Sequence, residues 1–279
     1  MSDQKTLKFW KYSGLGNKII LIDLVRQPGE ISSNDVARLA SDSKVEFDQL
    51  ITIEPPEFPE LDFSAEIFNR DGSKAENCIN GARCFGKHVF DSGLLRKEEL
   101  FVGVGINQWK IKELGEKIYS VEQEVKDLDY GITSLPNTNP SGLHDLEIDG
   151  KIFEIGFINL GNPHAINFNK DIKDMPLETL GVSIQKSKSF PEGVNLTLAE
   201  IKSPEEVYIR VFERGVGETL ACGSGACATV IKGFQLGYLR PEVQVNFKQG
   251  HLSIKYDDIE NSLVAKGPAD FIEEIDITL

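Results

Sequence analysis

Short apolar runs of strand length are spread along the whole chain, and they outnumber stretches with helical spacing. Such runs, rich in β-branched and aromatic residues and bounded by turn residues, are typical of strands. They predict strands at Leu7–Tyr12, Ile19–Leu24, Gln49–Ile53 and Phe63–Phe68 in the first half, and at Phe153–Asn159, Val207–Phe212, Val243–Phe247 and His251–Tyr256 in the second half. The chain is therefore expected to be of mixed α/β (α+β) class.

Two apolar stretches have helical spacing, and each begins directly after a cysteine. One follows Cys78 and ends near Gly93, and the other follows Cys222 and leads to Gly237. Both predicted helices are apolar on most of their surface, which indicates that each is wrapped by strands rather than lying at a protein surface. The pattern therefore places a cysteine at the N-terminus of each of two central helices.

Two short motifs recur in the same order about half a chain apart. Leu15–Asn17 returns as Leu160–Asn162 after 145 residues, and Cys78–Ala82 returns in related form as Cys222–Ala226 after 144 residues. A shared offset indicates duplication of one folding unit. The sequence thus favours two pseudo-symmetric lobes, each with strands around its own helix.

The boundary between the lobes is expected between about Glu116 and Asp129. This predicts an N-terminal lobe over residues 1–122 and a C-terminal lobe over residues 123–266. The last strand, within residues 267–279, is expected to return to the first lobe. Ser134–Gly142 is rich in Pro, Asn, Ser and Gly and is predicted to be a loop.

Composition narrows the function classes. The 279 residues are 40% hydrophobic and 27% charged, as in an ordinary soluble protein. The N-terminus lacks the apolar stretch of a signal peptide, and the run Ile19–Val25 is too short to span a bilayer, so a cytoplasmic protein with no membrane partner is expected. The net charge of −14 argues against nucleic-acid binding and implies that an anionic substrate is held locally, by a helix N-terminus or an arginine.

The four cysteines are expected to be thiols rather than a disulfide framework. A helix N-terminus stabilises a thiolate, so Cys78 and Cys222 are suited to acid–base chemistry. One thiolate can remove the α-proton of an amino acid while the other thiol protonates the opposite face. Backbone N–H groups of the helix starts can hold the carboxylate, so neither a cofactor nor a metal is expected.

Other interpretations of the cysteines remain open. A buried cysteine is often a small hydrophobic residue of the core, and this is the expectation for Cys84 and Cys227 inside the helices. The spacing of the cysteines does not favour a structural zinc site. A disulfide between Cys78 and Cys222 is expected only as an oxidised, inactive form.

The chain resembles the diaminopimelate epimerase family over nearly its whole length. The motifs that carry the resemblance are SGLGNKIILID, FDQL, IFNRDGSKAENCINGARCFG, NLGNPH, FPEGVNL and ERGVGETLACGSGACA. The resemblance implies two lobes, each a mixed, mostly antiparallel sheet wrapped around a central helix. It also implies a cytoplasmic homodimer that interconverts LL- and meso-diaminopimelate without a cofactor, for lysine and peptidoglycan precursors.

The resemblance also implies roles for individual residues. The substrate's α-carboxylate would be bound by the backbone N–H groups of Ile79, Asn80, Gly223 and Ser224. The distal amino-acid head would meet Asn69, Asn162, Asn195 and Arg214, with Asn17 and Gln49 lining the same site. His164 and Glu213 would support proton transfer at the thiols, and Glu213 would also contact substrate.

Two features keep alternative functions open. Ile79 follows Cys78 where the second copy has Gly223, and a β-branched side chain there is expected to stand close to the ligand's path. The run Lys44–Glu46 before Phe47 alters the loop next to Gln49. The alternatives are an epimerase or racemase of the same mechanism for another amino acid, and a non-catalytic paralogue that binds an amino acid.

Overall fold

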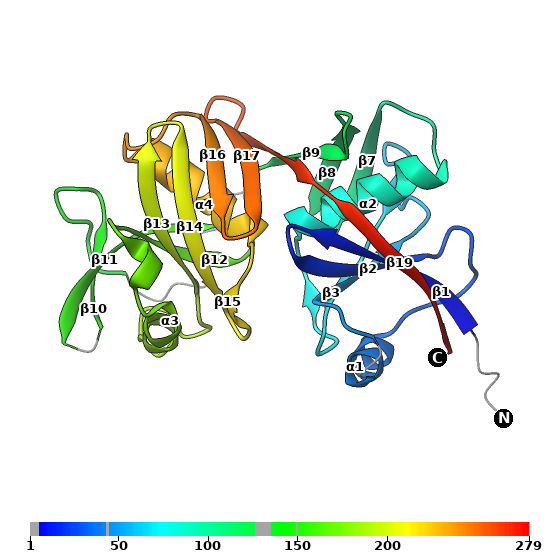
Figure 1. Cartoon of the computed structure of the whole chain (residues 1–279), viewed down its shortest axis with the longest axis horizontal. Coiled ribbons are helices and arrows are strands. Elements are labelled where there is room, and N and C mark those ends of the chain that lie inside the picture. Colours follow the sequence, from blue (N-terminus) through cyan, green and yellow to red (C-terminus); the bar gives the residue numbers. More distant parts are fainter. Residues whose placement is uncertain (1–5, 43–44, 126–134, 149, 279) are drawn as a thin grey trace. The chain divides into compact units, whose positions relative to one another are not determined.

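The computed structural model describes residues 6–42, 45–125, 135–148 and 150–278, and these form two compact units (Figure 1). Unit 1 contains the chain up to Gln123 together with the part from Lys266 onward, and unit 2 contains the chain from Glu124 to Ala265. Both combine helices and sheet, so the predicted α+β class is confirmed. Three residues named in the sequence analysis lie outside the described residues: Lys44 of the loop before Phe47, Asp129 at the end of the boundary region, and Ser134 at the start of the predicted loop.

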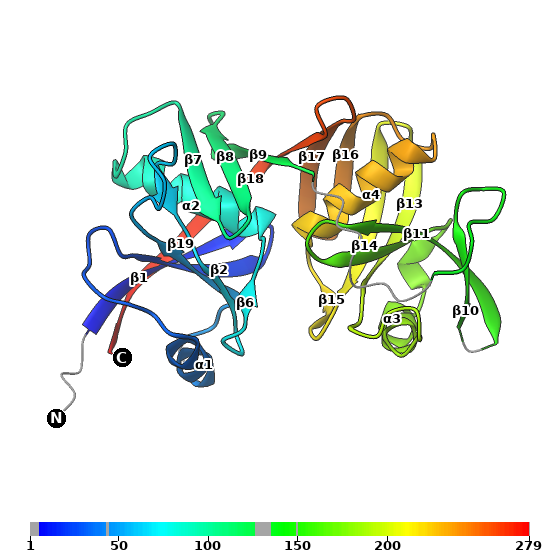
Figure 2. The same cartoon turned by 180° about the vertical axis from the view of Figure 1, so that it is seen from behind.

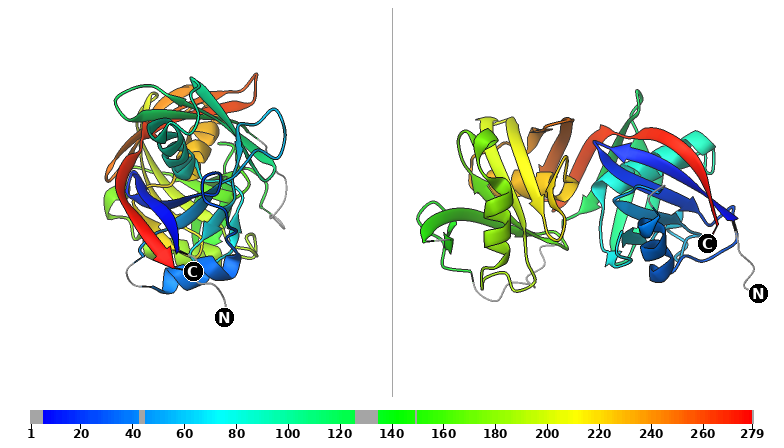
Figure 3. Two further views of the ribbon diagram at one scale, coloured as in Figure 1. Left: turned by 90° about the vertical axis from the view of Figure 1, so that its right-hand side faces the viewer. Right: turned by 60° about the horizontal axis from the view of Figure 1, so that its bottom comes forward.

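The first sheet of unit 1 has the strand order β19-β1-β2-β3-β5-β6. Its strands are β1 (Thr6–Gly14), β2 (Asn17–Asp23), β3 (Gln49–Ile53), β5 (Ile67–Asn69), β6 (Lys74–Ala75) and β19 (Asp270–Thr278). The pairing of β2 with β3 is parallel and the others are antiparallel. The C-terminal strand β19 pairs with β1, and the two lie side by side in both views of Figure 3.

Helix α2 is the centre of unit 1. It runs from Ile79 to Ser92, contacts β1, β2 and β3 on one side and β8 on another, and can be followed in Figure 2. The remaining elements of this unit are α1 (Ser33–Ser41), β4 (Phe63–Ser64), β7 (Glu99–Val104), β8 (Asn107–Glu113) and β9 (Ile118–Glu124), with the strand order β9-β8-β7-β4. Residues 79–89 of α2 are all buried, as the apolar pattern predicted.

Unit 2 is built in the same way around helix α4, which runs from Gly223 to Gln235 and contacts β11, β12, β13 and β17. Its strands are β10 (His144–Ile148), β11 (Lys151–Asn159), β12 (Pro163–Phe168), β13 (Asn195–Ser203), β14 (Glu206–Glu213), β15 (Gly217–Thr219), β16 (Glu242–Phe247), β17 (Gly250–Asp257) and β18 (Ser262–Pro268). The order is β10-β11-β12-β13-β14-β16-β17-β18, and β15 pairs with β14. A 3-10 turn (Ile172–Asp174) and α3 (Leu177–Gln185) complete the unit, and α3 packs on β13, β14 and β15.

One strand prediction is wrong. Phe63–Phe68 was expected to form one strand, but β4 pairs with β7 and β5 pairs with β3. The chain crosses from β7 to β3 between these two short strands. Ala65 N–H donates to the carbonyl of Gly103 in β7, and Glu66, the next residue, accepts from the N–H of Thr52 in β3. An unbroken apolar run does not reveal which partner each half of it meets.

The helices themselves are short. None within the described parts of the chain is long and apolar enough to cross a membrane.

Candidate active site

Cys78 is the N-cap residue of α2. Its backbone is extended, with φ −151° and ψ 96°, and its Sγ accepts a hydrogen bond from the N–H of Gly81 at 3.1 Å. A sulfur that accepts from the first turn of a helix is held where the helix dipole stabilises negative charge. The residue is partly exposed.

The two residues after Cys78 are both buried. Ile79 is 2% exposed and Asn80 is 4% exposed. The Ile79 side chain therefore belongs to the buried core, and its expected closeness to the ligand stays a prediction. Asn80 is oriented by Arg83, which is fully buried and donates from Nη2 to Asn80 Oδ1 at 2.8 Å.

Unit 1 also brings two predicted amides together. Gln49 in β3 and Asn69 in β5 are register partners, and Gln49 Nε2 donates to Asn69 Oδ1 at 3.0 Å. Asn69 Nδ2 donates to Ser73 Oγ at 3.1 Å. Asn17 begins β2 after a tight turn, and its Nδ2 donates to Asp48 Oδ2 at 3.1 Å.

Cys222 occupies the corresponding N-cap position of α4 in a different environment. It is 4% exposed, and its side chain forms no cap bond of ordinary geometry, although the backbone N–H of Gly225 is near enough to lower the pKa of its thiol. Its Sγ lies 3.5 Å from Ser224 Oγ. Burial raises the pKa of the Cys222 thiol well above its usual value, and the charge of the Glu213 carboxylate raises it further.

Glu213 ends β14 beside this cysteine. Thr219, in the antiparallel strand β15, donates from Oγ1 to Glu213 Oε1 at 2.5 Å. The sequence-based reasoning missed Thr219. The signal available for it was the short spacing from Glu213 around a glycine-rich turn, which brings the two side chains to the same hairpin.

Predicted residues from β12 and its turn complete the surroundings of Cys222. Asn162 Nδ2 donates to Ser224 Oγ at 3.2 Å, and Asn162 Oδ1 pairs with His164 Nε2 at 3.1 Å. His164 is fully buried. Burial, and to a smaller extent the charge of Arg214, lowers the pKa of His164 to about 3. This imidazole is neutral at physiological pH.

Arg214 and Asn195 form a second pair in unit 2. Asn195 begins β13 next to His164 of β12, and its Oδ1 accepts from the backbone N–H of Arg214 at 2.8 Å. The Arg214 guanidinium is exposed and donates from Nη1 to the carbonyl of Glu192 at 2.9 Å. A Cβ at Gly193 would lie 2.9 Å from Arg214 Cδ, so the glycine leaves room for this side chain.

The candidate residues thus fall into two groups, one in each unit. Unit 1 carries Asn17, Gln49, Asn69, Cys78, Ile79 and Asn80, and unit 2 carries Asn162, His164, Asn195, Glu213, Arg214, Cys222, Gly223 and Ser224. All four cysteines are free thiols. Cys84 and Cys227 are fully buried inside α2 and α4, so the prediction that they fill the core is confirmed. Burial raises the pKa of Cys84 to about 12.

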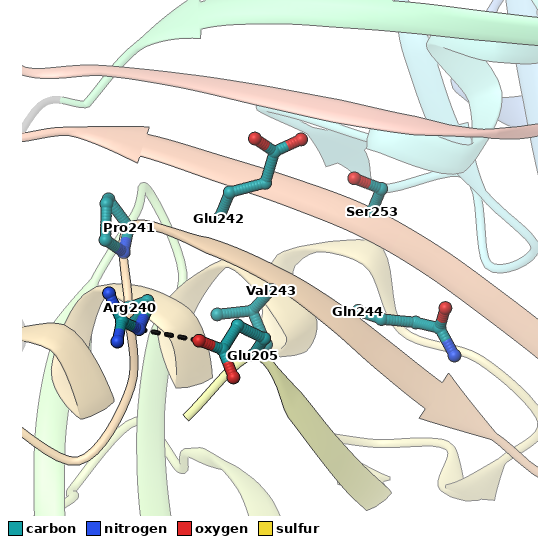
Figure 4. Close-up of a pocket in the computed structure, with 7 residues that line it drawn as sticks. All are labelled: Glu205, Arg240, Pro241, Glu242, Val243, Gln244 and Ser253. Carbon is teal, nitrogen blue, oxygen red and sulfur yellow. Dashed lines mark ion pairs between the residues drawn. The ribbon is translucent and has the colours of Figure 1, made fainter. Parts of the chain in front are cut away.

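One further surface feature lies in unit 2, apart from these residues. A hollow of about 480 Å³ in unit 2 is lined by Glu205, Arg240, Glu242 and their neighbours, and it contains none of the predicted site residues (Figure 4). Arg240 and Glu205 are already paired there, with Nε and Oε1 2.6 Å apart. Within the described ranges, His, Cys, Asp and Glu side chains form no cluster of three suited to hold a metal ion.

Solved structures share this fold at low sequence identity. A phenazine biosynthesis protein of the PhzF family from Bacillus anthracis has a TM-score of 0.68 at 14% identity, and the match covers 99% of this chain and 100% of that one. A hydroxyproline epimerase from Agrobacterium vitis has a TM-score of 0.65 at 11% identity, covering 100% of this chain and 94% of that one. At such identities the likeness shows the fold alone.

Curated relatives are much closer in sequence. Diaminopimelate epimerases from Teredinibacter turnerae and Buchnera aphidicola are 37% and 36% identical, and each alignment covers 94% of this chain and 96% and 93% of the relative. A diaminopimelate epimerase from Laribacter hongkongensis is 35% identical over 98% of this chain and 99% of its own. The profile of the family described as diaminopimelate epimerase matches residues 9–123 and 156–272.

The family profile and these relatives show that the chain is an isomerase of the epimerase class. Within that class, the chain belongs to the diaminopimelate epimerase family.

Proposed function

We propose that this protein interconverts LL- and meso-diaminopimelate, in the formation of lysine and peptidoglycan precursors, by proton transfer through Cys78 and Cys222. The observation that carries the proposal is the pair of N-cap cysteines, one on each central helix, in a chain that aligns with diaminopimelate epimerases over nearly its full length. The mechanism requires the two units to present the thiols to opposite faces of one α-carbon.

The chemistry is an exchange of protons at one carbon. The thiolate of one cysteine takes the α-proton as the Cα–H bond breaks, and the electron pair spreads into the carboxylate. The thiol of the other cysteine then gives its proton to the opposite face of the carbanion. Each turnover leaves the two sulfurs with exchanged protonation states, and proton exchange with water restores the starting state.

Helix N-termini supply the stabilisation of the carbanion. The substrate's α-carboxylate is held by the N–H groups of Ile79 and Asn80 from α2 and of Gly223 and Ser224 from α4. The N–H groups in the first turn of a helix lie outside its internal hydrogen-bond ladder, so such a position suits a carboxylate on which charge grows. Such fixed donors do for the carbanion what a cofactor does in other enzymes.

The distal head of the substrate is assigned to side chains of both units. Arg214 provides a planar fork that pairs with a carboxylate, and Asn162 and Asn195 lie near it in unit 2. Asn17, Gln49 and Asn69 contribute from unit 1. Glu213 contacts substrate and supports proton transfer at Cys222.

We also propose that the protein is a cytoplasmic homodimer. Strand β19 is an edge strand, and it exposes Phe271 and Ile272, which are 50% and 45% exposed. An exposed apolar edge is a surface that a second copy covers in many proteins. Sedimentation of the wild type and of Phe271→Glu tests this assembly, since a monomeric wild type would contradict it.

The function is tested by incubating the reduced protein with LL-diaminopimelate in deuterium oxide, without pyridoxal phosphate or added metal. We expect α-deuterium in the product and formation of the meso isomer. Cys78→Ala and Cys222→Ala should each lower epimerisation by about 10³-fold or more, because the two thiols act as one unit.

Cys84→Ala is the matched control, because it removes a thiol from α2 without touching the helix start. Absence of exchange in wild type with free thiols would refute the assignment to diaminopimelate. The same assay would then be run with other amino acids, and a protein that binds one of them without exchange would be a non-catalytic paralogue.

A further inference from the structure

Four side chains of unit 2 form a continuous hydrogen-bonded chain that ends at the sulfur of Cys222. His164 Nε2 is 3.1 Å from Asn162 Oδ1, and Asn162 Nδ2 is 3.2 Å from Ser224 Oγ. Ser224 Oγ is in turn 3.5 Å from Cys222 Sγ. The chain joins β12 to the start of α4, and its first member is fully buried.

The far end of the chain fixes the direction of its hydrogen bonds. The Glu213 carboxylate beside Cys222 can only accept, so in a hydrogen bond between them the S–H group is the donor. The lone pairs of the sulfur are then available to the Ser224 hydroxyl. Ser224 Oγ accepts from Asn162 Nδ2, and this orientation of the amide leaves Asn162 Oδ1 to accept from His164.

The other nitrogen of His164 supports the same direction. Among the described residues, His164 Nδ1 has no hydrogen-bond partner, although it is buried. A neutral imidazole carries one hydrogen, and placing it on Nε2 satisfies the contact with Asn162 and leaves only a lone pair unpaired. Protonating Nδ1 would create a buried charge without an acceptor, in the field of Arg214.

We propose that His164 is a positioning residue and not a proton carrier: its Nε2–H is the fixed donor at the head of the chain through Asn162 and Ser224, which aims the Ser224 hydroxyl at the sulfur of Cys222. When Cys222 gives its proton to the carbanion, the thiolate that forms already has a donor directed at it. No side chain then has to turn during the reaction. This role replaces the proton-transfer support that the family resemblance implied for His164.

Two amide substitutions separate the two roles. In His164→Gln the side-chain N–H₂ group stands near the place of Nε2, and in His164→Asn it stands near the place of Nδ1. Neither side chain titrates. We expect His164→Gln to keep kcat within about threefold of wild type, and His164→Asn to lower it about tenfold, because only the first retains a donor to Asn162. Equal losses in both variants would overturn the proposal.

A measurement on unmodified protein tests the inference without any variant. Nitrogen-15 imidazole spectra should show His164 as the Nε2–H tautomer, unchanged across the neutral pH range. An Nδ1–H tautomer, or titration near neutral pH, would overturn the proposal. Cysteine labelled with carbon-13 at Cβ then reports the ionisation of Cys222, which should shift in His164→Asn and in Ser224→Ala but not in His164→Gln.

The kinetic part of the test rests on the proposed function, and its failure can be recognised separately. If wild-type protein does not epimerise diaminopimelate, the proposed function fails while the two spectra still decide the role of His164. If wild type is active and the tautomer is the wrong one, only the positioning role fails.

Discussion

The two helix starts carry related motifs, yet their cysteines lie in different surroundings. Cys78 is partly exposed, and its sulfur accepts from the N–H of Gly81. Cys222 is buried beside the carboxylate of Glu213, and the backbone N–H of Gly225 only partly offsets the rise in its pKa. Burial and the Glu213 carboxylate therefore favour the neutral thiol at Cys222. In the proposed mechanism, two copies of the same residue thus act from different surroundings.

The largest effect on activity is expected when the carboxylate beside Cys222 is removed. Glu213→Gln should lower the pKa of the Cys222 thiol, because the second cause of its elevation after burial disappears, and should reduce kcat by about 10³-fold. Carbon-13 Cβ titration of Cys222 measures the first change and meso formation measures the second. The pKa stays above that of a free thiol, since burial remains.

Glu218→Gln is the matched control for this change. Glu218 lies in the same hairpin and pairs with Arg210 through Oε1 at 2.8 Å, so the variant removes a carboxylate that does not meet the thiol. A Cys222 titration that responds equally to both variants would show that general acidity, and not Glu213, sets the difference between the two helix starts.

The next effect concerns Ile79, which occupies the position of Gly223 in the second copy. Because the side chain is 2% exposed, Ile79→Ala should lower the free energy of unfolding by about 3 kcal/mol through loss of buried volume. Urea unfolding followed by tryptophan fluorescence measures it, since Trp10 and Trp109 both belong to unit 1. A change under about 1 kcal/mol would contradict a core role for Ile79.

The third prediction applies one substitution to equivalent positions of the two helices. A Cβ at Gly81 would lie 2.2 Å from Ile51 Cδ1 and 3.1 Å from Cys78 Sγ, whereas a Cβ at Gly225 would come no nearer than 3.2 Å to any neighbour. Gly81→Ala should therefore lower kcat about tenfold by displacing the sulfur, and Gly225→Ala about twofold. Steady-state kinetics compare them, and the reverse order would show that Cys222 is the more tightly positioned thiol.

Sequence patterns predicted the helix starts because apolar spacing and the repeat are local signals. They indicated which amides and charges gather at each cysteine only through the family resemblance. The contacts that set the two thiols apart were not predicted, since they join distant parts of the chain: Asn162 meets Ser224 across 62 residues. Thr219 was missed because its role depends on the turn that aims it at Glu213. The division of Phe63–Phe68 between two strand partners was lost for the same reason.

The smallest effect is expected for the two cysteines inside the helices. Cys84 and Cys227 are both fully buried within their helices, so neither thiol meets substrate in the proposed mechanism. Cys84→Ala and Cys227→Ala should each cost about 1 kcal/mol of stability for the lost packing and leave epimerisation within about twofold of wild type. Thermal unfolding and the deuterium assay measure both quantities. If either variant lost activity as Cys222→Ala is expected to, the chemistry would extend into the helix and the asymmetry could not be assigned to the caps alone.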